Sequence, residues 1–187
     1  MTPDWVADLQ QARIVAVLRS PDLTQGFAMA ETAIARGLRW LEVTWTSDRP
    51  AELLSQLRDK YPDCCWGAGS LLSLTDLEEA IAAGAQFGVS PILSLPLLER
   101  AQARDLPFLP GALTPTEIMT AHAAGAAVVK LFPASSAGGP AYVRSLQQPL
   151  NHPKLFACGG IHPDAVQSYL DAGAIAVGLG SQLFAKT

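Results

Sequence analysis

Residues 126–133 read AAVVKLFP and carry the clearest structural signal in the chain. They form a short apolar, β-branched run that stops at a proline, which is typical of a buried strand. Because side chains alternate along a strand, Lys130 is expected to share a face with Val128 and Phe132. A lysine is rarely buried unless it has a partner or a chemical role. Two interpretations follow: a snorkelling or paired lysine, or a buried amine kept neutral so that it can attack a carbonyl.

Similar short apolar runs recur on both sides of this stretch, and each except the last is followed by a helical pattern. The predicted strands are residues 14–18, 41–45, 65–69, 87–90, 107–110, 126–133, 154–157 and 175–178. The predicted helices are residues 4–11, 23–36, 50–60, 75–83, 95–104, 114–125, 140–148 and 163–172. Continuous apolar strands separated by helices indicate parallel pairing with right-handed crossovers. About eight such units favour a closed (β/α)8 barrel over an open doubly wound sheet.

The length of the chain limits this architecture to one domain. With 187 residues, the chain lies at the low edge for a barrel that typically takes ~250 residues. Only seven residues follow Gly180, so the last helix must be one turn or be supplied by a neighbouring molecule. We therefore predict an α/β fold, a single (β/α)8 TIM-barrel domain over residues 1–187, with a short or missing final helix.

Composition excludes several classes of function. A net charge of −4 argues against a general nucleic-acid binder, and no apolar run approaches the ~20 residues of a membrane span. The three cysteines show no Cys-x-x-Cys spacing, so neither a disulfide framework nor a zinc site is expected, and a reducing cytoplasm is the simplest setting. The first residues lack the basic and then apolar run of a signal peptide.

In a TIM barrel the active site gathers at the carboxyl ends of the strands. The polar residues predicted there are Arg19, Glu42, Thr44, Ser70, Ser90, Lys130 and Ser181. Glu42 is a lone carboxylate in a strand as apolar as that of Lys130, so it is either a structural ion-pair partner or a proton carrier. If both side chains point into the barrel, they come within reach of each other and each explains the other.

Two glycine loops follow the last two strands. Gly159 and Gly160 end the seventh strand, and Gly180 and Ser181 end the eighth. TIM barrels often bind a phosphate at these two loops, on backbone N–H groups and the N-terminus of a short helix, and glycine lets the backbone approach the anion. Either loop alone would indicate a tight turn. Both together, in these two places, favour a phosphate site.

A family resemblance emerges from motifs spread over nearly the whole chain. In order they are LEVT at 41–44, GAGS at 67–70, VSP at 89–91, PG at 110–111 with TPTE at 114–117, VKLFP at 129–133, GGI at 159–161 and GS at 180–181. This pattern resembles the class I KDPG/KHG aldolases, which act on 2-keto-3-deoxy-6-phosphogluconate, its 6-phosphogalactonate epimer or 4-hydroxy-2-oxoglutarate. The resemblance implies a cytoplasmic homotrimer that needs no metal or other cofactor.

The resemblance also implies roles for individual residues. Lys130 would form the Schiff base and Glu42 would move the protons. The implied substrate-binding residues are Arg19, Thr44, Ser70, Pro91, Phe132, Gly159, Gly160, Gly180 and Ser181. Many members carry arginine at the position of Thr46, whereas this chain resembles the branches with an arginine at the end of the first strand, so we assign the substrate carboxylate to Arg19. Cys158 stands where many members have threonine near the sugar hydroxyls, which leaves the preferred epimer open.

The predicted function is therefore cleavage of a small 2-keto acid, phosphorylated if the glycine loops are used. Lys130 would attack the C2 carbonyl, and the iminium would accept electrons while the C3–C4 bond breaks, giving pyruvate and D-glyceraldehyde 3-phosphate. One alternative is a 4-hydroxy-2-oxoglutarate aldolase giving pyruvate and glyoxylate. Others are a phosphosugar isomerase or decarboxylase, which would want a further carboxylate or histidine at a strand end, and a non-catalytic barrel that binds a phosphorylated ligand.

Overall fold

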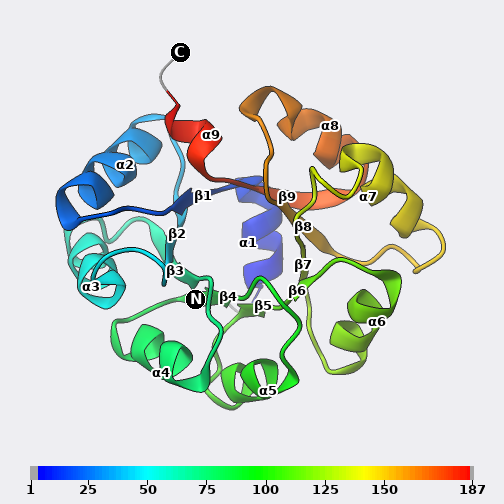
Figure 1. Cartoon of the computed structure of the whole chain (residues 1–187), viewed down its shortest axis with the longest axis horizontal. Coiled ribbons are helices and arrows are strands. Elements are labelled where there is room, and N and C mark those ends of the chain that lie inside the picture. The colour runs from blue at the N-terminus through cyan, green and yellow to red at the C-terminus, as the bar shows by residue number, and fades with distance from the viewer. Residues whose placement is uncertain (1–3, 186–187) are drawn as a thin grey trace.

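The computed structural model describes residues 4–185 as a ring of parallel strands surrounded by helices (Figure 1). The strands are β1 Ile14–Leu18, β2 Trp40–Thr44, β3 Cys65–Gly69, β4 Phe87–Val89, β5 Phe108–Leu109, β6 Gly111–Ala112, β7 Val129–Leu131, β8 Leu155–Cys158 and β9 Ala174–Leu179. The helices are α1 Trp5–Ala12, α2 Leu23–Ala35, α3 Pro50–Lys60, α4 Leu74–Ala82, α5 Leu95–Ala103, α6 Pro115–Ala123, α7 Gly139–Gln147, α8 Val166–Asp171 and α9 Ser181–Phe184. A 3-10 turn, Pro163–Ala165, leads into α8. The predicted single-domain TIM barrel is confirmed.

The strands follow the order β5-β4-β3-β2-β1-β9-β8-β7-β6, so the two ends of this sheet are β5 and β6. These two short strands are halves of one extended segment on either side of Pro110. β5 pairs with β4, and β6 pairs with β7. The fifth predicted strand, residues 107–110, is therefore a two-part segment that reaches Ala112. Because proline has no N–H to donate to a ladder, pairing changes partner at this residue.

The helices begin where the sequence has capping residues. Ser73 and Asp76 form a capping box at the start of α4, and Thr114 and Glu117 form another at the start of α6. In each box the side chain of the first residue accepts from the backbone N–H of the acidic residue, which accepts in return. Such boxes satisfy backbone donors that an isolated helix start leaves unpaired.

The buried apolar residues form two clusters, one inside the barrel and one in the layer around it. The larger lies between strands and helices and includes Leu41, Trp66 and Leu131. The smaller fills the barrel interior with Trp40, Phe87, Val89, Val128 and Phe156 among others. Leu9 of α1 belongs to this inner cluster and is 1% exposed. In Figure 1, α1 lies within the ring of strands, so this helix closes one end of the barrel.

The final helix is short, as the sequence predicts. α9 has four residues and is tied to α2 because the Arg36 side chain donates to the Leu183 carbonyl. Residues 1–3 and 186–187 of the predicted domain lie outside the described residues. Within residues 4–185, no helix combines the length and apolar character needed to cross a bilayer.

Candidate active site

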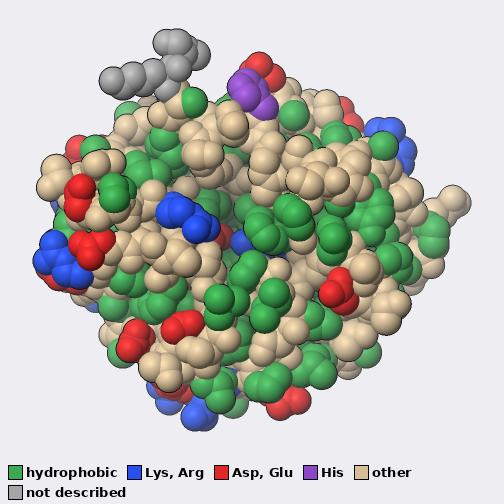
Figure 2. Space-filling model, viewed as in Figure 1, with side chains coloured by type: hydrophobic (Ala, Val, Ile, Leu, Met, Phe, Trp, Pro, Cys, Tyr) green, Lys and Arg blue, Asp and Glu red, His purple; other side chains and the backbone are tan. Residues whose placement is uncertain are grey.

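A cavity of about 610 Å³ opens at the carboxyl ends of the strands. Its walls include every residue that the sequence predicts for catalysis and substrate binding: Arg19, Glu42, Thr44, Ser70, Pro91, Lys130, Phe132, Gly159, Gly160, Gly180 and Ser181. Figure 2 shows the face hollowed near its middle, with basic side chains at the hollow. Residues far apart in sequence meet here because the carboxyl ends of parallel strands face the same way.

Lys130 lies at the middle of β7 and is 4% exposed. Its Nζ lies 5.0 Å from the centroid of the Phe132 ring, two residues further along the same face of the strand. Its backbone N–H donates to the Pro110 carbonyl at 2.8 Å, which fixes the strand against the two-part segment. The amine therefore reaches the cavity from a rigid strand with an aromatic wall beside it.

Glu42 lies on β2, is fully buried and lines the same cavity. Neither carboxyl oxygen has a hydrogen-bond partner among the described residues. Burial raises the pKa of Glu42, and the charges of Lys130 and Arg19 oppose that rise. The structure forms no ion pair between Glu42 and Lys130, which argues against the interpretation of Glu42 as a structural ion-pair partner. A buried carboxyl without partners is costly in a folded protein, and such groups are typical of sites with a chemical role.

Arg19 follows β1, and its side chain is exposed at the cavity wall. Nearby hydroxyl groups hold the ends of β1 and β2 together. Thr44 Oγ1 lies 3.2 Å from Ser47 Oγ, and Ser47 Oγ accepts from the backbone N–H of Ser20 at 3.1 Å. These bonds fix the loop that follows β2 relative to the residue after Arg19. An exposed guanidinium at the cavity wall can form two parallel hydrogen bonds to a carboxylate.

Ser70 ends β3 with φ of 58°, in the left-handed region that side chains other than glycine rarely adopt. Non-glycine residues in this region carry strain of the order of 1–3 kcal/mol and cluster at functional sites. Pro91 follows β4 and contributes to the same cavity wall. Ser90, also predicted at this end, is buried, and its hydroxyl accepts from the backbone N–H of Ile92 at 3.3 Å. Ser90 is therefore placed as a loop-forming residue beside the cavity.

The two glycine loops meet at the cavity. Gly159 and Gly160 have φ of 103° and 70°, a conformation that favours glycine. A side chain on Gly159 would also approach Phe132 at 3.0 Å. Gly180 has open space where a side chain would lie. Both loops and Ser181 line the same cavity, and backbone N–H groups and a hydroxyl on such loops can hold an anion.

Eight further lining residues were not assigned to the site from the sequence. They are Val17, Met29, Thr46, Leu72, Cys158, Ile161, Gln182 and Phe184. Val17 and Cys158 had a readable signal, because each lies at an inward strand position in period two with other site residues. Burial raises the pKa of the Cys158 thiol, in part against the Lys130 charge. Thr46, Leu72 and Ile161 come from loops, Met29 comes from α2, and Gln182 and Phe184 come from α9. Their side chains reach the cavity only through tertiary packing, which no simple period in the sequence marks.

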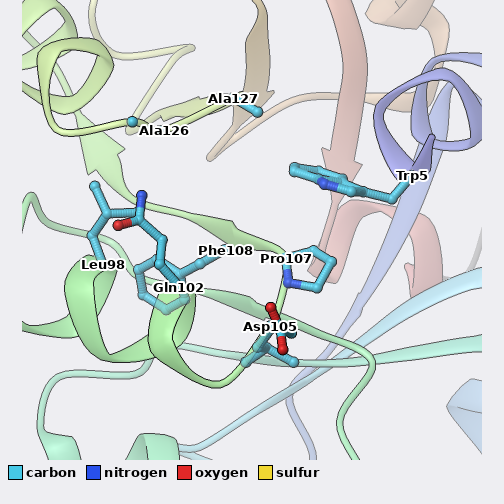
Figure 3. A pocket seen from close by; sticks show the side chains of 10 residues that line it. Trp5, Leu98, Gln102, Asp105, Pro107, Phe108, Ala126 and Ala127 are labelled. Carbon is cyan, nitrogen blue, oxygen red and sulfur yellow. The ribbon is translucent and has the colours of Figure 1, made fainter. Parts of the chain in front are cut away.

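A second cavity, of about 430 Å³, involves α1 and the N-terminal end of β5. Figure 3 shows Trp5 of α1 on one side and Leu98 and Gln102 of α5 on the other. Asp105 is the one ionisable side chain among its lining residues. This pocket lacks both a nucleophile and a paired acid and base, so it does not compete as an active site. Within residues 4–185, no group of three or more His, Cys, Asp and Glu side chains is arranged to hold a metal ion.

Comparisons with known proteins agree with this geometry. The family model "KDPG and KHG aldolase" matches residues 6–187. A 2-dehydro-3-deoxy-phosphogluconate aldolase of Treponema pallidum is 32% identical over 162 residues, which cover 87% of this chain and 77% of that protein. A 2-dehydro-3-deoxy-6-phosphogalactonate aldolase of Escherichia coli is 32% identical over 173 residues, covering 91% of this chain and 84% of that one. A crystal structure of the KDPG aldolase from Legionella pneumophila, with pyruvate captured as a covalent carbinolamine intermediate, matches with a TM-score of 0.84 and 29% identity, covering 91% of this chain and 82% of that one.

Proposed function

Because the chain belongs to the KDPG and KHG aldolase family, and is therefore a carbon–carbon lyase, we propose that it cleaves 2-keto-3-deoxy-6-phosphogluconate or its galacto epimer through a Schiff base on Lys130. The observation that carries this proposal is the meeting of Lys130, Glu42 and Arg19 in one cavity. Curated relatives named for each epimer are 32% identical to this chain, so identity alone does not separate the two substrates.

The reaction begins when neutral Lys130 attacks the C2 carbonyl of the 2-keto acid. Protons move through the carbinolamine, water leaves, and an iminium forms between C2 and Nζ. Glu42, with its buried and unpaired carboxyl oxygens, carries these protons directly or through a water molecule. Because the pKa of Glu42 is raised by burial, this carboxyl can hold a proton nearer neutral pH than an exposed glutamate.

The iminium then serves as the electron sink for carbon–carbon cleavage. The C4 hydroxyl loses its proton to a base, the C3–C4 bond breaks, and its electron pair moves toward the iminium to form an enamine. The aldehyde leaves, C3 takes up a proton, and hydrolysis of the restored iminium releases pyruvate and free Lys130. We assign both proton transfers to Glu42 and the binding of the pyruvate carboxylate to Arg19.

The substrate phosphate is assigned to the loops of Gly159–Gly160 and Gly180–Ser181. Positive φ at the first pair and open space at Gly180 support this placement. Ser181→Asp would put a negative charge where the phosphate binds, so KM for a phosphorylated substrate should rise while KM for 4-hydroxy-2-oxoglutarate changes little. An unchanged KM for both substrates would remove the phosphate assignment.

Borohydride trapping tests the proposed chemistry directly. Reduction in the presence of pyruvate should add one pyruvate-derived group to Lys130, located by peptide mass mapping, and Lys130→Ala should lose both the adduct and cleavage. Modification of a different lysine would contradict the mechanism, and no adduct at all would favour a non-catalytic barrel. Cleavage rates for the two sugar-acid epimers and for 4-hydroxy-2-oxoglutarate then decide among the family's substrates.

The homotrimer and the cytoplasmic location stay proposals drawn from the family resemblance. Exposed apolar side chains support self-association, since Leu72 and Ile92 near the cavity are 56% and 51% exposed. Mass determination by light scattering at micromolar concentration should give three times the mass of the chain. A monomer or dimer under these conditions would contradict the trimer without affecting the chemistry.

A further inference from the structure

The inner face of β3 presents no side chain over its last three residues. Trp66 and Ala68 belong to the outer apolar cluster, and Cys65 packs against the inner one. Alternation along the strand therefore directs Gly67 and Gly69 into the barrel. Neither glycine has a positive φ, so the backbone conformation does not require glycine at either position. The close packing around each glycine offers another reason for the missing side chain.

Each of these two glycines leaves room for one neighbouring side chain. A Cβ added at Gly67 would overlap the ring of Phe87, which is 1% exposed in the inner cluster. A Cβ added at Gly69 would overlap Oε1, Cδ and Cγ of Glu42. The first glycine thus accommodates a packing residue, and the second accommodates the carboxyl group of the proposed proton carrier.

The strand register shows where Glu42 is directed. Glu42 pairs with Gly67, and Thr44 pairs with Gly69. The carboxyl group of Glu42 nevertheless lies against Gly69, two residues nearer the carboxyl end of β3. The side chain therefore leans along its strand toward the cavity mouth, as strand side chains commonly do. Since neither carboxyl oxygen has a hydrogen-bond partner among the described residues, hydrogen bonds do not explain this placement, whereas the shape of the surrounding surface does.

We propose that Gly69 is a positioning residue, whose missing side chain leaves the space that holds the Glu42 carboxyl group in the cavity. This inference rests on the proposed role of Glu42 in proton transfer. In Gly69→Ala, the methyl group would displace the end of a flexible side chain, which the fold can tolerate. A displacement of about 1 Å at a reacting group can lower a rate by ~10²-fold. We expect kcat to fall by about 10- to 100-fold, with a smaller change in KM and a shift in the pH profile of kcat.

A double-mutant cycle with Glu42→Gln separates positioning from general damage. If Gly69 acts through Glu42, Gly69→Ala should lower kcat strongly in the wild type and hardly at all in the Glu42→Gln background. Additive losses, or an unchanged pH profile of kcat in Gly69→Ala, would overturn the inference. Should Glu42→Gln itself retain full activity, the proposed function of Glu42 would fail, and that result is distinct from failure of the positioning role.

Gly67→Ala provides the matched control on the same strand. It places the same methyl group against Phe87, so it should lower thermal stability more than Gly69→Ala does and leave the pH profile of kcat unshifted. Rates are divided by the folded fraction measured by circular dichroism, so partial unfolding of a variant is not counted as lost catalysis. Glu42→Asp is a second background, because its shorter side chain withdraws from Gly69. There too Gly69→Ala should add little, and a full further loss would contradict the inference.

Discussion

The two ends of the barrel interior are built on the same strands yet serve opposite purposes. Toward the end closed by α1, the inward side chains include Trp40, Val128 and Phe156, which pack together in the inner cluster. Two residues further along the same strands stand Glu42, Lys130 and Cys158, which line the open cavity. Two residues along each strand thus separate the packed apolar side chains from the side chains that line the cavity. The closed end provides stability, whereas the open end holds buried polar groups that oppose it.

Lys130→Met tests this contrast most severely, because it places an apolar side chain, of the kind found at the closed end, in the open end. Without the nucleophile, cleavage should fall by on the order of 10⁴-fold or more. Stability should stay equal or rise, since an apolar side chain of similar length replaces a polar amine that is 4% exposed. Steady-state kinetics and urea unfolding measure the two effects. A marked loss of stability would mean that the amine serves the fold.

Phe87→Ala makes the converse change at the closed end. The Phe87 ring lies 5.1 Å from that of Trp40 and is 1% exposed. Removing it should lower the free energy of unfolding by about 3–5 kcal/mol. The rate of cleavage per folded molecule should change little. The number of folded molecules is given by the Lys130 sites that borohydride traps with pyruvate. If instead kcat fell with stability unchanged, the division between the two ends would be wrong.

Arg19→Gln examines the rim of the open end, where the side chain is exposed. Loss of a charge-assisted contact worth about 1.5–3 kcal/mol should raise KM for 2-keto acids by about 10- to 100-fold. Folding should be unaffected, because the guanidinium lies at the surface. Replacing the nearby exposed Arg49, which pairs with Asp48 at 3.3 Å outside the cavity, is the control. Equal effects of the two substitutions would remove the assignment of Arg19 to the carboxylate.

Glu42→Gln tests the buried carboxyl of the open end through the pH dependence of stability. Burial raises the pKa of Glu42 above its ordinary value of 4.5, so between these two values the folded protein binds more protons than the unfolded chain. Stability from this group is therefore full below pH 4.5 and is lost as pH rises toward the raised pKa. Relative to wild type, Glu42→Gln should gain stability as pH increases above 4.5. Urea midpoints across pH 4 to 8, a range chosen around the carboxyl reference value, measure this. A constant difference would contradict the shifted pKa.

Sequence reasoning predicted the barrel and brought the main candidate site residues to one end of it for one physical reason. Short continuous apolar strands and the helical patterns between them reveal the order of elements, and parallel topology then places residues such as Arg19 and Glu42 at a common end. The change of partner at Pro110 was not predicted, because two-residue strands carry too little pattern. Met29 and Gln182 were also missed, since side chains from helices and loops reach the cavity only through tertiary packing. The role of Gly69 depends on a contact with a different strand, which no single stretch of sequence contains.

The two-part segment around Pro110 closes the ring because its first half pairs with one neighbouring strand and its second half with the other. β5 bonds to β4 on one side, and β6 bonds to β7 on the other. The ring cannot open at this point without breaking such bonds, because the Gly111 N–H also donates to the Ile92 carbonyl, beyond β4, at 3.1 Å. The Lys130 amide donates to the Pro110 carbonyl, so the backbone of the proposed nucleophile is bonded to this junction between the two halves. Hydrogen–deuterium exchange of this amide requires that bond to open, so its rate measures how often the strand of Lys130 separates from the Pro110 segment.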